Sequence, residues 1–267
     1  MKEYLVCIDS DGCAIDAMTI KHERAFGPVF VETFGLQKHR EEILKEWDKL
    51  NLYSLSRGIN RFRGLYEIMK YVIKNFEDID GFEHYEKWVN TTSNFSNDSI
   101  EKEIENNNHE IFKKVLKWSN NLNEVVKNIP EEDIKAFENA KKTIEDISKT
   151  ADIAIVSSAN KHAIESEWER EGLLKFVKYF CTQEVGTKEY SISKLLEEGY
   201  DKEKVIKIGD AMGDLNAALA NDVYFYPILA NHEEESWKEF DEIYFEKFLN
   251  GQYNQDELIH KFKSNLE

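Results

Sequence analysis

Near the start of the chain lies the stretch Tyr4-Leu5-Val6-Cys7-Ile8-Asp9-Ser10-Asp11-Gly12-Cys13-Ala14-Ile15-Asp16, in which a short apolar run ends in two acidic residues. A strand made only of apolar residues is typical of a parallel sheet that is covered on both faces. Such sheets bind ligands beyond the carboxyl ends of their strands, which is where Asp9 and Asp11 are expected. Because strand side chains alternate with period two, both carboxylates can face one ligand, and Gly12 lets the backbone approach it closely.

More short apolar runs follow later in the chain, with helical patterns between them: Ile153–Val156, Val177–Cys181, Val205–Ile208 and Val223–Leu229. This alternation predicts an α/β fold with a doubly wound parallel sheet. The helical pattern is clearest from Pro130 to Lys149, where apolar residues recur at three- and four-residue steps. A second helix is expected over Glu189–Gly199, because a glycine commonly ends a helix.

The segment between the first two strands has helical patterns and no convincing strand. We expect its helical stretches near residues 19–34, 39–50, 61–75, 82–90 and 99–126. Loops of this length without secondary structure are uncommon in compact domains. The sequence therefore predicts an all-helical domain at 17–126, inserted into a core made of 1–16 and 127–267.

Composition narrows the classes of function. The chain has 267 residues, of which 41% are hydrophobic, so it can bury a sizeable core. With 35 basic against 52 acidic residues its net charge is -17, which argues against nucleic acid and membrane surfaces as partners. Three cysteines form no disulfide framework, and no apolar run is long enough for a signal peptide or a membrane span. We therefore expect a soluble, cytoplasmic protein.

Polar residues that suit phosphate chemistry follow two more predicted strands. Ser157 and Ser158 come directly after Ile153–Val156, and their hydroxyls can donate to a phosphoryl oxygen. Lys188 precedes a predicted helix, where a fixed cation can neutralise clustered acids and a substrate phosphate. Each residue alone also suits a turn or a solvated surface position. Their common place at strand ends favours a site.

A second pair of acids, Asp210 and Asp214, follows the run Val205–Ile208. Either one alone also suits a helix N-cap or a first helical turn. Hard oxygen ligands from Asp9, Asp210 and Asp214 suit Mg²⁺, which binds proteins through one or two carboxylates together with substrate phosphate.

These motifs resemble those of the haloacid dehalogenase superfamily, most closely its phosphatase-like members. Residues 9–16 look like that superfamily's D-x-D-G-T-x-x-D, with Cys13 in place of threonine. Ser157 matches its second motif, Lys188 its third, and Gly209-Asp210 with Asp214 its fourth. The resemblance implies a Rossmann-like core and a Mg²⁺-dependent phosphatase that acts on a small phosphorylated metabolite.

The resemblance also implies a role for each matching residue. Asp9 would attack phosphorus to form an aspartyl phosphate, and Asp11 would protonate the leaving oxygen and then activate water. Ser157 would hold a phosphoryl oxygen, and Lys188 would steady the acids and the phosphate. The metal would be bound by Asp9, the Asp11 carbonyl and Asp210, with Asp214 as a direct ligand or a group behind it. Gly12 and Ser158 would lie against the substrate.

The inserted helical segment matches the position of a cap domain in one branch of the superfamily, where cap residues choose the substrate. Its candidate contacts are Arg57, Asn60 and Arg61, in a stretch unusually rich in arginine for so acidic a chain. Arg57 and Arg61 lie four residues apart and can share a helix face aimed at an anion. The alternative is an ordinary surface helix whose arginines pair with Asp48 and Glu67.

Other functions fit the same fold. A phosphonatase would need a Schiff-base lysine in the cap, for which Lys45 and Lys49 have no distinctive context. A sugar-phosphate mutase is also open. A catalytically silent binding protein is the alternative from a different class, and the presence of all four motifs argues against it.

Overall fold

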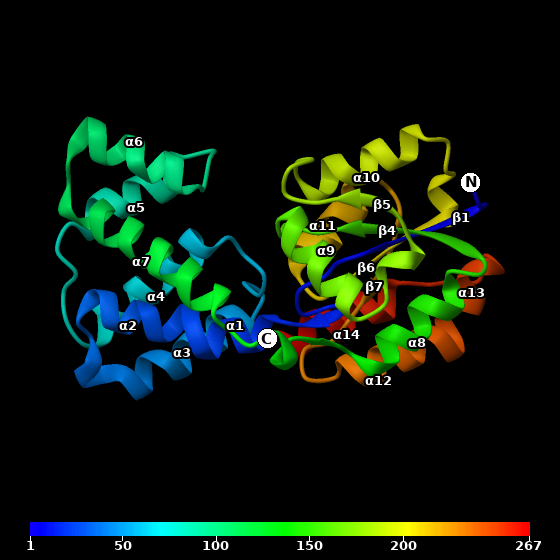
Figure 1. The fold of residues 1–267 in the computed structure, drawn as a ribbon, viewed down its shortest axis with the longest axis horizontal. Helices are drawn as coiled ribbons and strands as arrows, with labels where there is room; N and C mark the ends of the chain where they lie inside the picture. Colours follow the sequence, from blue (N-terminus) through cyan, green and yellow to red (C-terminus); the bar gives the residue numbers. More distant parts are fainter. The chain divides into compact units, whose positions relative to one another are not determined.

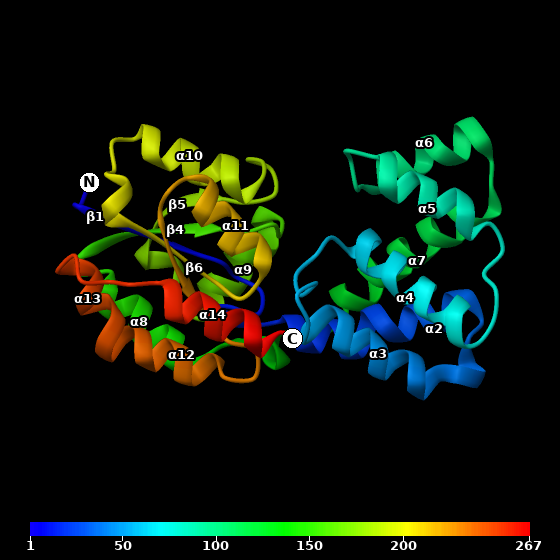
Figure 2. The same ribbon diagram turned by 180° about the vertical axis from the view of Figure 1, so that it is seen from behind.

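The computed structural model describes residues 1–267, and the chain divides into two compact units. An α/β unit contains Met1–Met18 and Glu131–Glu267, and a helical unit contains Thr19–Pro130. The sequence placed the inserted segment at 17–126, so its expected boundaries lie a few residues before those of the helical unit. Figures 1 and 2 show each unit from two sides.

The α/β unit is built on a five-stranded sheet with the order β5-β4-β1-β6-β7. Its strands are β1 (Tyr4–Ile8), β4 (Ala151–Val156), β5 (Val177–Cys181), β6 (Val205–Gly209) and β7 (Tyr224–Pro227), and all neighbours pair in parallel. Every residue of β4 and β6 is buried, and apart from Asp152 and Lys207 none of them is charged, as is expected of parallel strands covered on both faces. The predicted doubly wound parallel sheet is confirmed.

Helices cover both faces of this sheet. In Figures 1 and 2, α10 (Lys188–Glu197) and α11 (Met212–Ala220) lie on one face, and α8 (Glu138–Ile147) and α12 (Glu233–Glu239) lie on the other. The unit also contains α9 (Lys161–Arg170), a π-helical turn at Phe240–Tyr244, α13 (Phe245–Leu249) and α14 (Asp256–Asn265). Because the chain passes from β1 outward to β5 and returns to β6 on the other side of β1, the order reverses between β1 and β6. Ligands of open α/β sheets bind at such a reversal.

The helix expected from Pro130 begins only at Glu138, so the prediction was wrong at its N-terminal end. Residues 135–136 form the short strand β3 (Lys135–Ala136), which pairs antiparallel with β2 (Ile15–Asp16). The N–H of Phe137 also donates to the Ala14 carbonyl at 3.1 Å. These tertiary hydrogen bonds hold the segment extended and override its helical periodicity.

The helical unit contains no strand. It consists of α1 (Met18–Lys21, which begins at the last residue of the α/β unit), a π-helical turn at His22–Phe26, α2 (Gly27–Phe34), α3 (Arg40–Leu52), α4 (Arg61–Asn75), α5 (Phe82–Thr91), α6 (Asn97–Asn107) and α7 (Glu110–Lys127). The stretch expected near 99–126 is two helices, because Asn108 takes a left-handed conformation with φ 49° and ends α6. The core is aromatic, and Trp47, Trp88 and Trp118 are all buried in it. No helix of the chain combines the length and the apolar character needed to cross a membrane.

Candidate active site

The loop that follows β1 is held in one conformation by its own backbone. The Ser10 carbonyl accepts hydrogen bonds from the N–H groups of Cys13, Ala14 and Ile15 at 2.9–3.2 Å. Gly12 has φ 78°, a left-handed conformation that glycine adopts without strain. The Ser10 hydroxyl accepts a hydrogen bond from the Trp168 indole at 3.0 Å. The loop therefore holds Asp9 and Asp11 on either side of the buried residue Ser10.

Asp9 belongs to a cluster of three buried carboxylates. Asp9, Asp210 and Asp214 each offer an oxygen, and these oxygens all lie within 4.8 Å of one another. Asp9 follows β1, Asp210 follows β6, and Asp214 lies in the first turn of α11. Gly209 makes room for this approach, since a Cβ at that position would lie 2.2 Å from the Asp214 Cγ. The cluster forms where the order of the strands reverses.

Two lysines neutralise part of this charge. Lys188, the first residue of α10, places Nζ 3.0 Å from Asp9 Oδ2 and 2.8 Å from Asp214 Oδ1. Lys207, on β6, places Nζ 2.7 Å from the same Asp214 oxygen. Burial by itself would raise the pKa of Asp9, but Lys188 and then Lys207 outweigh it and hold that pKa below its ordinary value. Asp9 is therefore ionised at neutral pH.

Sequence reasoning missed Lys207. It lies inside the run Val205-Ile206-Lys207-Ile208, which was interpreted only as a buried strand. A lysine with apolar neighbours in a strand buried on both faces is itself a signal, because a buried ammonium group needs an acidic partner.

The donors present fit a hard divalent cation. Asp9 Oδ1 is buried and accepts no hydrogen bond, so one carboxylate oxygen of the cluster lacks a partner that an ion can supply. Asp214 differs, because both of its oxygens are already engaged: Oδ1 with the two lysines, and Oδ2 with the Ala211 N–H at 3.3 Å. Carboxylate oxygens suit Mg²⁺. Asp214 is therefore less well placed as a metal ligand than Asp9, and Asp210 is the remaining carboxylate of the cluster.

The remaining predicted core residues lie at the same edge of the sheet. Ile8 of β1 pairs with Ile155 of β4, so Ser157 follows its strand close to the level of Asp9. Ser157 is buried, and its Oγ accepts a hydrogen bond from the Ala159 N–H at 3.3 Å, while Ser158 is exposed. The Asp11 side chain is not part of the three-carboxylate cluster. Its assignment as a metal ligand through the carbonyl stays a prediction.

Burial makes the thiol of Cys13 unreactive. The residue is fully buried, and burial, reinforced by Asp210 and then Asp9, raises its pKa well above the ordinary value.

The three predicted substrate contacts of the helical unit have partners within that unit. Arg57 lies before α4 begins, so the expectation that it shares a helix face with Arg61 was wrong. Its side chain is 2% exposed and donates to the Leu52 carbonyl at 2.8 Å. Asn60 caps α4 by accepting a hydrogen bond from the Phe62 N–H at 2.9 Å.

Arg61 is the only one of the three predicted contacts that belongs to α4 itself. It donates to the Asn123 side chain at 2.7 Å, and its guanidinium lies 5.7 Å from the centre of the Phe26 ring. The predicted binding of substrate by Arg57, Asn60 and Arg61 stays a prediction.

Comparison with known proteins agrees with this geometry. Residues 59–228 match a protein family described as haloacid dehalogenase-like hydrolase. The matched range contains Ser157, Lys188 and Asp210, and it begins after Asp9 and Asp11. No curated protein sequence matches the chain.

Solved structures resemble most of the chain at low sequence identity. A proposed beta-phosphoglucomutase from Thermotoga maritima has a TM-score of 0.52 at 15% identity, covering 90% of this chain and 99% of its own. A proposed phosphatase from Clostridium difficile has a TM-score of 0.49 at 18% identity, covering 86% of each chain. At such identities, the likeness to the Thermotoga protein shows a shared fold.

Proposed function

The chain belongs to the haloacid dehalogenase-like hydrolases, and we propose that it is a Mg²⁺-dependent phosphatase of a small phosphorylated metabolite, working through an aspartyl phosphate. One observation carries this proposal: buried Asp9 lies against Lys188 and beside Asp210, at the point where the strand order reverses. An ionised carboxylate next to a fixed cation is the arrangement that nucleophilic attack on a phosphate ester requires.

The reaction then proceeds in two displacements. In the first, a carboxylate oxygen of Asp9 forms a bond to phosphorus, the bond from phosphorus to the ester oxygen breaks, and Asp11 gives that oxygen a proton. In the second, Asp11 takes a proton from water as the water oxygen attacks the same phosphorus, and Asp9 leaves as a carboxylate. Splitting one difficult displacement into two easier ones is the advantage of a covalent intermediate.

Charge on the phosphoryl oxygens is offset from several sides. Lys188 is held in place by the carboxylates of Asp9 and Asp214. Burial would lower the pKa of Lys188, but Asp214 and then Asp9 outweigh burial and raise that pKa. The ammonium group therefore stays charged. The Ser157 hydroxyl supplies a hydrogen-bond donor from the end of β4. When bound by Asp9 and Asp210, Mg²⁺ would add the largest positive charge and lower the repulsion between phosphate and carboxylates.

Selection of the substrate by the helical unit is part of the same proposal. We keep Arg61 as its foremost candidate for an anion contact, because its side chain is only partly buried. Arg57 is nearly fully buried and is bonded to a carbonyl, so it is better suited to holding the loop before α4.

The three cysteines are buried and form no disulfide, which is compatible with the reducing cytoplasm that we propose as the location.

A phosphatase assay with p-nitrophenyl phosphate and Mg²⁺ tests this function. We expect slow turnover in the wild type that chelation of the metal removes, and a loss of at least about 10⁴-fold in Asp9→Asn. Asp222→Asn is the matched control, because it replaces an exposed carboxylate at a left-handed position that asparagine tolerates. Full activity in Asp9→Asn would refute the nucleophile. Rearrangement of a sugar phosphate without release of inorganic phosphate would indicate a mutase instead.

A further inference from the structure

Lys207 is a fully buried lysine on β6, next to the central strand of the parallel sheet, with an exposed fraction of 0%. Its Nζ donates to the carbonyls of Ile208 at 2.9 Å and of Val156, on β4, at 3.3 Å. Its only ion pair is with Asp214 at 2.7 Å. Burying an ammonium group is costly, and a strand whose other residues are apolar does not need one for packing. The side chain therefore calls for an explanation in terms of the site.

The geometry around Asp214 supplies this explanation. Oδ1 of Asp214 is shared by Lys207 and Lys188, whereas Lys188 also reaches Asp9 at 3.0 Å. Without Lys207, the negative charge of Asp214 would be opposed by Lys188 alone. Lys188 would then be drawn toward Asp214 and away from Asp9, and Asp214 would become a stronger competitor for a divalent cation.

We propose that Lys207 is a positioning residue of this site, which neutralises Asp214 so that Lys188 stays at Asp9 and the metal stays with Asp9 and Asp210. The inference rests on the proposed phosphatase function for its effect on turnover. Lys207 acts through Asp214 and Lys188 and does not itself contact the reacting atoms. A purely structural role would require only the two carbonyl hydrogen bonds.

The substitution Lys207→Gln separates these roles, because it removes the charge and keeps an amide that can donate to the strand carbonyls. We expect Mg²⁺ alone, measured by titration calorimetry, to bind the variant at least about tenfold more tightly, since a buried unit charge repels the cation strongly. We also expect kcat for p-nitrophenyl phosphate to fall about 100-fold, with KM changed less than about threefold, because Lys188 is misplaced. Structural damage would instead weaken metal binding and turnover together.

Two further variants sharpen the test. Lys207→Gln combined with Asp214→Asn removes both charges of the pair, so Mg²⁺ affinity is expected to return to within about threefold of the wild type. Lys202→Gln is the matched control, since it removes one positive charge from an exposed lysine shortly before β6. It should leave both Mg²⁺ affinity and kcat unchanged.

The outcomes distinguish the inference from the proposed function. If the wild type turns over p-nitrophenyl phosphate and Lys207→Gln matches it in kcat and Mg²⁺ affinity, the positioning role is overturned and the phosphatase stands. If the wild type has no turnover, the phosphatase fails, and a tighter Mg²⁺ affinity of Lys207→Gln still supports the charge role. Should Lys207→Gln fail to fold while the double variant folds, charge compensation is supported. Failure of both to fold would overturn it in favour of a structural lysine.

Discussion

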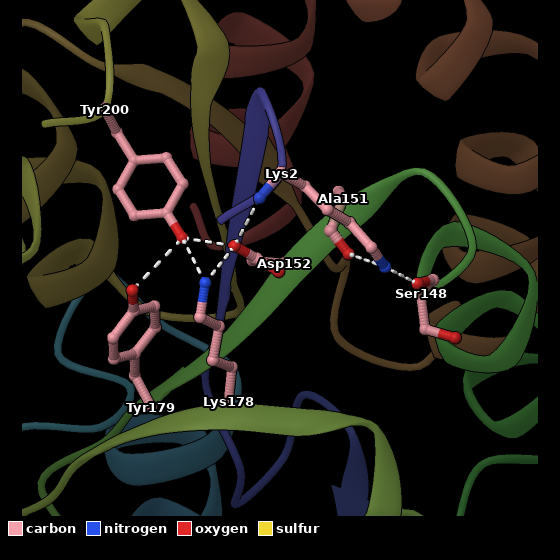
Figure 3. A network of polar contacts seen from close by, with 7 residues as sticks. All are labelled: Lys2, Ser148, Ala151, Asp152, Lys178, Tyr179 and Tyr200. Carbon is pink, nitrogen blue, oxygen red and sulfur yellow. Dashed lines mark hydrogen bonds and ion pairs between the residues drawn. The ribbon is translucent and has the colours of Figure 1, made fainter.

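Asp152, a buried acid within a strand of the sheet, permits a prediction about stability that does not depend on catalysis. It lies near the amino end of β4, away from the carboxyl ends that carry the site, and it is 8% exposed. Figure 3 shows three donors converging on its Oδ2: the Lys2 N–H at 2.9 Å, Lys178 Nζ at 2.5 Å and the Tyr200 hydroxyl at 2.5 Å. The network joins the N-terminus, β4, β5 and the segment after α10.

The substitution Asp152→Asn keeps one acceptor oxygen and removes the charge. Hydrogen bonds to a charged group contribute about 1.5–3 kcal/mol each to the free energy of unfolding, and neutral ones contribute about 1 kcal/mol. Removing the charge therefore costs roughly 1 kcal/mol for each buried bond. The bond from Lys178 is discounted, because its side chain is 36% exposed and water screens the pair. The expected loss in the free energy of unfolding is therefore about 2 kcal/mol at pH 7, and about 1 kcal/mol for Tyr200→Phe.

The size of this loss depends on pH, and its sign follows from the pKa. Burial would raise the pKa of Asp152, but the bonds from Lys178 and Tyr200, with that from Lys2, outweigh it and hold the pKa below its ordinary value of 3.8. Because the folded pKa is depressed, the stabilisation is complete above the unfolded pKa and disappears as pH falls through the folded pKa. The gap between wild type and Asp152→Asn should be constant from pH 7 to about 5 and should shrink below about pH 4.

Urea unfolding of the α/β unit at several pH values measures this gap, with hydrogen-exchange protection of β1 and β4 to identify the unit that opens. Asp222→Asn is again the control, because it removes an exposed carboxylate, and its stability should equal that of the wild type at every pH. A gap that stays constant from pH 7 to pH 3 would refute the reasoning, since it would show that the charge of Asp152 contributes nothing.

Three more predictions concern the site. Asp11→Asn should slow the hydrolysis of alkyl phosphates about 100- to 10,000-fold, because their leaving oxygen needs a proton. The initial burst with p-nitrophenyl phosphate should persist, because nitrophenolate leaves without a proton. Equal losses with both substrates would exclude the role of Asp11 as an acid. Gly209→Ala should lower kcat about 100-fold without unfolding the protein, because its Cβ would lie 2.2 Å from Asp214 Cγ; unchanged kcat contradicts this. Iodoacetamide at pH 8 should label neither Cys7 nor Cys13 before unfolding, because burial raises the pKa of Cys7 to about 12 and that of Cys13 well above its ordinary value. Labelling of either residue in the native state would show that it is accessible.

The sheet and its acids were predictable from sequence because they depend on local pattern. The three inner strands β1, β4 and β6 are short and almost entirely buried, and Asp9 and Asp210 directly follow β1 and β6. Once the strands are parallel, their carboxyl ends must meet at one edge, so the sequence already brings these residues together.

The features that sequence reasoning missed depend on contacts between distant segments. The start of α8 is set by the strand before it, because β3 pairs with β2, which lies more than a hundred residues earlier in the chain. Arg57 was placed on a helix because its spacing from Arg61 fits one, but the chain turns before α4, and the Arg57 guanidinium donates to the Leu52 carbonyl. Lys207 was overlooked because its partner, Asp214, lies on the following helix rather than beside it in the sequence.

Trapping of the covalent intermediate tests the central claim, that Asp9 is the nucleophile, most directly. Borohydride reduces an aspartyl phosphate to homoserine, and peptide mass spectrometry identifies the residue converted. Asp11→Asn is the best protein for this measurement, because its intermediate should form from p-nitrophenyl phosphate with Mg²⁺ and then persist. We predict homoserine at position 9, and none when the substrate is left out. Homoserine at another carboxylate, or none anywhere while p-nitrophenol is released, would contradict the assignment.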